Sequence, residues 1–165
     1  PRRGERNLSV AMFVGEFEQS LDAKHRLAIS SSLREQIDPQ DGSGFVLVLG
    51  PDRHLWLYPD LYYKRLLESL RRSPLPSRQS RRLELLFAMA RIDEADAQGR
   101  IVLPEKSMQR AGIADEVTLV GLNDHIEIWP RDEWNAHVEE SLPSYGDILY
   151  EAAEHMDGME QGGKG

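Results

Sequence analysis

Two short stretches of this chain carry the same pair of charged residues at the same spacing. Asp22 is followed four positions later by Arg26, and Asp96 is followed four positions later by Arg100. An arginine oriented by a carboxylate presents a planar fork of donors that suits a phosphate or the edge of a guanine. The alternative is a salt bridge that only closes each loop. Because an exposed ion pair contributes only about 0–1 kcal/mol, stability is a weak reason to place it twice.

The residues between each aspartate and arginine differ in the two copies. Lys24 adds a positive group to the first loop, whereas its counterpart Gln98 is neutral but still able to hydrogen-bond a base or a phosphate. His25 stands where the second copy has Gly99. If this position needs a positive φ, glycine adopts it freely and histidine is strained. His25 is either a phosphate contact or a solvent-exposed loop residue. We expect more charge in the first loop and more backbone freedom in the second.

The duplication extends beyond these loops. Residues 47–50 and 54–59 (LVLG, HLWLYP) match residues 118–121 and 125–130 (TLVG, HIEIWP). The loops are 74 positions apart (22 to 96) and the hairpins 71 (50 to 121). A unit of about 60 residues has a marginal core by itself, so each copy is predicted to be one half of a shared core.

Hydrophobic periodicity predicts the same order of elements in each unit, namely strand, polar loop, strand, short helix, strand, turn and strand. The chain divides into five predicted segments: an extension expected to be disordered (1–11), the first repeat with its following helix (12–70), a Pro/Arg-rich linker and helix (71–89), the second repeat with a closing helix (90–142), and an acidic, glycine-rich tail (143–165).

Three local features are also predicted. Ser32 and Glu35 have the spacing of a helix-capping box. Residues 78–88 are predicted to form one helix, with Leu83, Leu86 and Phe87 on one face. Residues 157–165 are expected to be disordered because they are rich in glycine.

The histidines and aromatic residues of the hairpins have structural interpretations. His54 and His125 occupy equivalent positions, but no further ligands lie nearby at metal-binding spacing, so we expect satisfied strand-end histidines and no metal site. Tyr58 and Trp129 each precede a proline and are predicted to anchor the core.

Composition narrows the class of protein. There is no cysteine, and no apolar run approaches a membrane span. The first residues lack an apolar signal core, so a cytoplasmic location is expected. No phosphate loop, zinc-protease or nucleophile-elbow motif is present, so we predict neither an enzyme nor a cofactor. The net charge of −8 argues against nucleic acid by itself, but arginines cluster between positions 71 and 91, which leaves room for a local basic face.

The motifs resemble those of the bacterial MraZ family. The resemblance rests on the segment from Met12 through Arg26, on the second motif at 96–104, and on the second hairpin with Val120-Gly121 and Glu127–Trp129. It spans about residues 12 to 134, which is most of the chain.

The resemblance implies an α+β fold of two pseudo-twofold-related AbrB-like halves with swapped hairpins, forming a small double-ψ-like β-barrel with short helices. It implies a ring-shaped homo-oligomer and a nucleoid-associated transcription factor, generally a repressor of its own division and cell-wall gene cluster. The implied partner is double-stranded promoter DNA carrying short direct repeats, with no membrane and no small-molecule substrate.

The resemblance also assigns the DNA-contacting residues. They are Lys24, His25 and Arg26 in the first loop and Gln98 and Arg100 in the second, oriented by Asp22 and Asp96. His25 and Ser30 depart from the family pattern, which usually has glycine and proline at these positions. A ring would concentrate such loops on one face, so weak contacts add through multivalency and binding depends strongly on salt.

A second class of function stays open. AbrB-like halves also occur in antitoxins, and the apolar helix at 62–70 is suited either to docking a protein partner or to packing within the core or between subunits. The alternative is therefore a ring-forming scaffold or an antitoxin-like protein-binding module.

Overall fold

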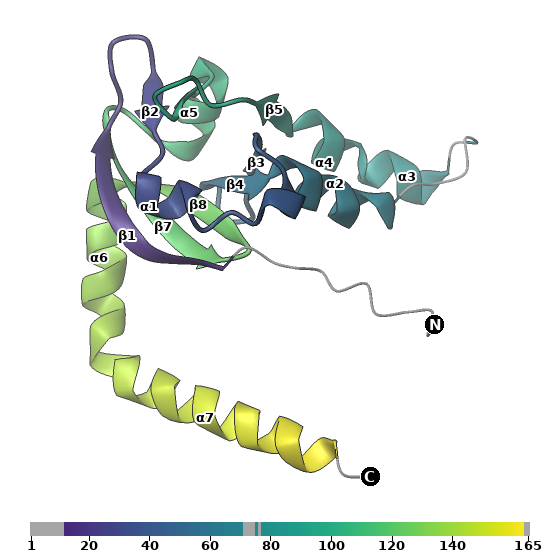
Figure 1. Ribbon diagram of the computed structural model, residues 1–165, viewed down its shortest axis with the longest axis vertical. Coiled ribbons are helices and arrows are strands. Elements are labelled where there is room, and N and C mark those ends of the chain that lie inside the picture. The colour runs from purple at the N-terminus through teal and green to yellow at the C-terminus, as the bar shows by residue number, and fades with distance from the viewer. Residues whose placement is uncertain (1–11, 71–74, 76, 164–165) are drawn as a thin grey trace. The chain divides into compact units, whose positions relative to one another are not determined.

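The computed structural model describes residues 12–70, 75 and 77–163. The expected N-terminal extension (1–11) and residues 71–74 and 76 of the predicted linker therefore lie outside the described residues. The chain divides into one unit that ends at Arg131 and a second that begins at Asp132. The first unit contains both repeats, and each has the predicted order of elements (Figure 1).

The two repeats contain corresponding strands and helices. The elements of the first repeat are β1 (Phe13–Ser20), β2 (Arg26–Ala28), α1 (Ser31–Arg34), a 3₁₀ turn (Pro39–Asp41), β3 (Phe45–Leu49) and β4 (Leu55–Pro59). The elements of the second repeat are β5 (Arg91–Asp93), β6 (Arg100–Val102), α5 (Glu105–Ala111), β7 (Glu116–Asn123) and β8 (His125–Pro130). Between them lie α2 (Asp60–Glu68), α3 (Arg78–Arg82) and α4 (Glu84–Ala88).

Strand pairing interleaves the two repeats. One antiparallel sheet has the order β1-β7-β8-β4-β3-β5, and a separate ladder pairs β2 with β6. The counterparts in the two repeats are β1 and β5, β3 and β7, and β4 and β8. Counterparts lie at equal distances from opposite edges of the sheet, so the repeats are related by a pseudo-twofold axis. β1 completes the second hairpin and β5 completes the first, which means that neither repeat forms its sheet alone. The expected α+β fold of two swapped halves is confirmed.

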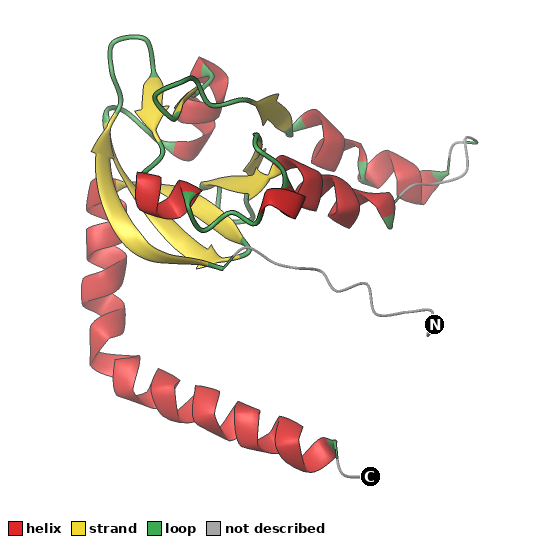
Figure 2. Cartoon of the chain, in the orientation of Figure 1, coloured by secondary structure: helices red, strands yellow, loops and turns green. Residues whose placement is uncertain are grey.

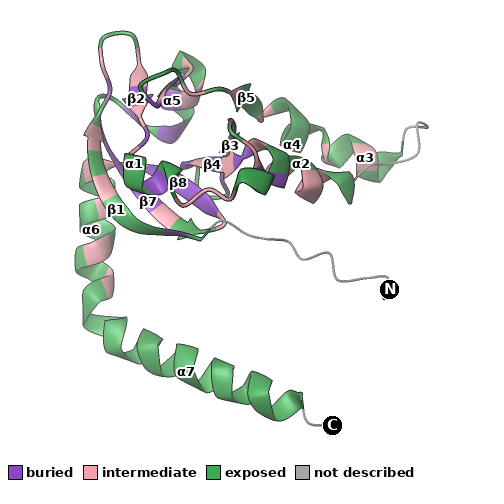
Figure 3. Ribbon diagram, viewed as in Figure 1, coloured by how far each residue is buried: buried purple, intermediate pink, exposed green. Residues whose placement is uncertain are grey.

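One apolar core lies beneath the strands of both repeats (Figure 3). Its members alternate along the strands because successive side chains point to opposite faces. The largest fully buried side chains are Phe13, Phe45, Leu27, Ile29, Leu33, Leu47, Leu55, Leu57, Ile101, Leu103, Leu119 and Ile126. The contribution from both repeats explains how units of this size share a stable core.

Two predictions about the helices of this unit are wrong. α1 starts at Ser31 with Ser30 as its N-cap and no side-chain capping bond, so Ser32 and Glu35 form no capping box. Residues 78–88 form two helices, because α3 ends at Arg82 and α4 begins at Glu84, with Leu83 as the cap between them. A capping box does occur in this region, between Ser77 and Ser80.

The second unit consists of helices (Figure 2). α6 (Arg131–Ser141) starts at the last residue of the first unit, and a 3₁₀ turn (Leu142–Ser144) leads to α7 (Tyr145–Gly162). The prediction that residues 157–165 are disordered is wrong for residues 157–162, because α7 continues to Gly162. None of the helices in the described part of the chain has the length and apolar character needed to cross a membrane.

Candidate nucleic-acid interface

The β2–β6 ladder places the two arginines of the repeated motif on one face. Leu27 lies opposite Ile101 at its centre, and both side chains are buried. Arg26 lies opposite Val102, and Ala28 lies opposite Arg100. Because side chains alternate between faces, the arginines share the face turned away from the core. They are diagonal neighbours, and residues in this relationship lie about 7–8 Å apart, within reach of long side chains.

The loop that precedes β2 is organised by the Asp22 carboxylate. Its Oδ1 accepts hydrogen bonds from the backbone N–H groups of Lys24 and Arg26, each at 2.9 Å. Its Oδ2 accepts a bond of 2.5 Å from Nε of Arg26. One side chain therefore holds both the turn and the direction of the arginine. Figure 2 shows this loop standing away from the sheet.

The loop that precedes β6 has the same arrangement. Oδ1 of Asp96 accepts from the N–H groups of Gln98 and Arg100, each at 2.9 Å, and Oδ2 accepts from Nε of Arg100 at 2.8 Å. In this copy Nη2 of Arg100 also donates to the Gln98 side-chain carbonyl at 2.7 Å. Gln98 therefore positions the guanidinium, a role that Lys24 cannot take because an ammonium accepts no hydrogen bond.

Each loop is closed by a residue with positive φ and is joined to the other repeat. His25 has φ 57° and Gly99 has φ 75°, so the geometry that favours glycine is present in both copies. The Gly99 carbonyl accepts from Ile29 N–H, and the His25 carbonyl accepts from Leu103 N–H, each at 2.9 Å. These bonds cross between the repeats and fix the loops relative to each other.

Hydrogen bonding keeps both carboxylates ionised. The backbone N–H of Arg26, together with its side chain and the N–H of Lys24, lowers the pKa of Asp22 to about 2 and outweighs the opposing effect of desolvation. The backbone N–H of Arg100 is the main cause of the lowered pKa of Asp96. Each arginine therefore faces a permanent negative charge at neutral pH, which orients its guanidinium through Nε.

The outer ends of the guanidinium groups are available to a ligand. The side chains of Arg26 and Arg100 are 32% and 28% exposed. Within the described residues, Arg26 makes no hydrogen bond or ion pair through its Nη atoms, and Arg100 uses only Nη2, toward Gln98. Each arginine thus retains donors directed away from its aspartate. Lys24 is exposed and His25 half-buried in the first loop, and Gln98 is exposed in the second.

Arg34 also lies at this surface, although the sequence analysis did not identify it. It is the last residue of α1 and is exposed, and its Nε donates to the Ile29 carbonyl at 3.0 Å. Its guanidinium lies directly against Gly99 of the second loop. The repeat contains no sign of this role, because the residue 74 positions further on is Met108.

The side of the β4–β8 pair that faces away from the core carries histidines and aromatic rings. His54 stacks on Trp129 with centroids 3.7 Å apart, and Trp56 stacks on His125 at 3.9 Å. Tyr58 and Trp129 are only half-buried, so the prediction that they anchor the apolar core is wrong. Among the described residues, no group of acidic or histidine side chains could hold a metal ion.

His125 in this cluster is held as part of a charged network. Its ring nitrogens lie 2.8 Å from an Asp124 oxygen and 2.9 Å from a Glu127 oxygen. Burial acts to lower the pKa of His125, but the hydrogen bonds to Glu127 and Asp124 outweigh it and raise the pKa above the ordinary 6.5. Burial likewise acts to raise the pKa of Glu127, yet bonds from His125 and Trp129 lower it. His125 is the satisfied strand-end histidine that was predicted.

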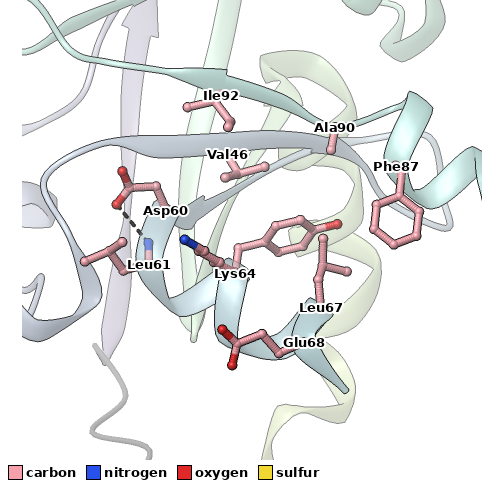
Figure 4. Close-up of a pocket in the computed structure, with 10 residues that line it drawn as sticks. Val46, Asp60, Leu61, Lys64, Leu67, Glu68, Phe87, Ala90 and Ile92 are labelled. Atoms are coloured by element: carbon pink, nitrogen blue, oxygen red, sulfur yellow. Dashed lines mark hydrogen bonds between the residues drawn. The ribbon is translucent and has the colours of Figure 1, made fainter. Parts of the chain in front are cut away.

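An apolar groove lies apart from the arginine loops. It has a volume of about 530 Å³ and is formed by β3, α2, α4 and β5 (Figure 4). Phe87 from α4 and Ile92 from the edge strand β5 are 51% and 77% exposed beside it. Contiguous apolar surface with an open strand edge is typical of a protein-contact site.

The fold and the loops together define a two-repeat α+β protein that presents a pair of carboxylate-oriented arginines on one face of a short ladder. Comparison with known proteins gives the family. The MraZ family, whose description also calls it antitoxin-like, matches residues 12–85 and 86–146. The chain belongs to the MraZ family.

Relatives of this chain carry the same name. It is 38% identical over 138 residues to "Transcriptional regulator MraZ" of Pediococcus pentosaceus, covering 83% of this chain and 94% of the relative. The protein of that name from Heliobacterium modesticaldum is 34% identical with the same coverage. The one from Lactobacillus delbrueckii subsp. bulgaricus is 35% identical over 150 residues, covering 90% of this chain and 99% of the relative.

Proposed function

We propose that this chain is a sequence-specific DNA-binding transcriptional regulator that contacts DNA through its two Asp–Arg loops. The observation that carries the proposal is the shared face of Arg26 and Arg100, each held through Nε by an aspartate and each retaining Nη donors. The regulator names of the relatives support it.

The chemistry of this face suits a duplex. A guanidinium donates to phosphate oxygens or bidentately to the major-groove edge of guanine. The loops stand at opposite ends of an antiparallel ladder, so the two arginines reach outward at diagonal positions of a two-stranded ribbon. The major groove admits such a ribbon. Lys24 and Gln98 lie in the same loops and add a phosphate contact and a hydrogen-bonding amide.

The proposal includes assembly into a ring that binds direct-repeat boxes upstream of its own division and cell-wall gene cluster and represses it in the nucleoid. A ring reconciles the net charge of −8 with DNA binding, because it repeats the arginine face while the acidic residues lie elsewhere. The apolar groove with Phe87 and Ile92 supplies a surface for a second copy. Ile92→Glu is expected to lower the oligomer mass measured by light scattering, and an unchanged mass would exclude the groove as the contact.

The test of the DNA interface is a gel-shift titration on DNA upstream of its own gene with Arg26→Ala and Arg100→Ala. Both variants are expected to lose promoter binding while keeping the circular dichroism spectrum and oligomer mass of the parent. Arg110→Ala, which removes an exposed arginine from α5, is the matched control and should bind normally. Normal binding by both loop variants would reject the loops as the interface.

The apolar groove also supports a second candidate, a scaffold or antitoxin-like protein-binding module. This function predicts a stoichiometric protein partner whose binding is lost in Phe87→Glu, together with no promoter affinity at low salt. Promoter binding that depends on Arg26 and Arg100 would favour the transcriptional regulator over the protein-binding module.

A further inference from the structure

Arg34 links the first repeat to the loop of the second. Its Nε is held at 3.0 Å by the Ile29 carbonyl, and the Ile29 N–H is in turn bonded to the Gly99 carbonyl at 2.9 Å. A β-carbon added at Gly99 would lie 2.5 Å from Cζ of Arg34 and 3.0 Å from Nη1. The guanidinium therefore occupies the space that any larger residue at position 99 would fill.

The two loops have different sources of positive charge. The first loop has Lys24 and Arg26 within its own sequence, whereas the second has Arg100 and the neutral Gln98. Arg34 brings a second cation to the second loop from across the pseudo-twofold axis. The first loop receives no such addition, because the counterpart of Arg34 is Met108, which is buried. Each loop is thus accompanied by two cationic side chains, although only the first loop carries both in its own sequence.

The charge of Arg34 is not neutralised by any of the described residues. It makes no ion pair with any residue that the structure describes, and Nε is the only guanidinium nitrogen with a hydrogen-bond partner among them. It is exposed and lies at the end of the ladder from which Arg100 projects. Its guanidinium is held through Nε and has no partner for either Nη group among the described residues, which is the arrangement of Arg26.

We propose that Arg34 is a further DNA-contacting residue. It binds a phosphate beside the second loop, as Lys24 does beside the first. This inference rests on the proposed function. Gly99 has a second role in it, since the absence of a side chain leaves room for Arg34 as well as permitting the positive φ. His25 in the first loop is compatible with this, because the counterpart of Arg34 is Met108 and not an arginine.

The experiment measures promoter affinity against salt concentration for Arg34→Gln, Lys24→Gln and the matched control Arg110→Gln, each of which removes one positive charge. Every phosphate contact contributes about 0.9 to the slope of log affinity against log salt. Arg34→Gln and Lys24→Gln are each expected to reduce the slope by about 0.9 for every copy that engages the DNA. The ratio of parent affinity to variant affinity should therefore be about eightfold larger per copy at 0.1 M salt than at 1 M salt. Arg110→Gln should leave the slope unchanged.

A second comparison separates contact from structural support. Arg34→Lys keeps the charge and is expected to retain most of the salt slope, although it loses the hydrogen bond through Nε. Gly99→Ala is expected to weaken binding more in the parent than in Arg34→Gln, because displacement of the guanidinium adds to the backbone strain that both proteins share. If the parent protein binds the promoter and Arg34→Gln has the same salt slope as Arg110→Gln, the inference about Arg34 is overturned. A parent protein that fails to bind would overturn the proposed function itself.

Discussion

Leu27 and Ile101 face each other across the β2–β6 ladder, and each is the other's counterpart in the repeat, 74 positions apart (27 to 101). The same holds for Trp56 and Glu127 in the β4–β8 pair, 71 positions apart (56 to 127). The pseudo-twofold axis therefore passes through both pairs. The buried contact of Leu27 with Ile101 sets the register that brings Arg26 and Arg100 to one face.

Shortening Leu27 should destabilise the fold. Leu27→Ala leaves a cavity beside Ile101 and is expected to lower the free energy of unfolding by about 2–5 kcal/mol. Val102→Ala on the exposed face is the control, with an expected change of no more than about 0.5 kcal/mol. Denaturant titration measures both, and equal effects would show that the ladder contributes no core packing.

The Asp22 carboxylate should contribute a pH-dependent part of the stability. Its pKa is lowered from 3.8 to about 2, so the native state favours the ionised form. The stabilisation is therefore present above pH 3.8 and is lost as the pH falls toward 2. Asp22→Asn lacks this contribution, so its melting temperature should be below that of the parent at pH 6 and should approach it between pH 4 and 2. A difference that stays constant over this range would contradict the hydrogen-bond geometry.

The positive φ of His25 predicts opposite effects for two substitutions. His25→Gly removes left-handed strain of about 1–2 kcal/mol but adds about 0.4–1 kcal/mol of unfolded-state entropy, so stability should rise by up to about 1.6 kcal/mol. His25→Val, with a branched β-carbon, should lower it by about 1–3 kcal/mol. Urea unfolding distinguishes them, and a Val variant as stable as the parent would exclude a left-handed residue here.

The charged network around His125 should weaken at alkaline pH. Its pKa is raised above 6.5 in the folded state, so its stabilising contribution is complete below pH 6.5 and is lost as the pH rises through the higher folded value. The melting temperatures of the parent and of His125→Gln should therefore converge between pH 6 and 9. His155→Gln, on the exposed helix α7, serves as the control and should follow the parent throughout. A gap that widens with pH would show that His125 is neutral in the fold.

Much of the site follows from local patterns. The Asp–Arg spacing predicts the pairing of Asp22 with Arg26, because residues this close meet in a tight turn whatever the rest of the chain does. The glycine at position 99 likewise indicates the positive φ that His25 shares. The helix ends were less predictable, since α1 begins without a side-chain cap and Leu83 interrupts the helix expected at 78–88.

The sequence by itself determined that this protein consists of two halves with matching loops, because a duplicated order of strands, turns and charges is a local property. Only the tertiary structure decided which strands pair across the halves, since the hydrogen bonds of β1 with β7 and β3 with β5 join residues far apart in the chain. The pairing of β2 with β6 likewise places the arginines on one face, and the hydrogen bond between Ile29 and Gly99 accompanies the contact of Arg34 with Gly99. No sequence pattern indicates the role proposed for Arg34, because it depends on the contact of Arg34 with Gly99 in the other repeat. Neither residue by itself signals this contact, which only the tertiary structure creates.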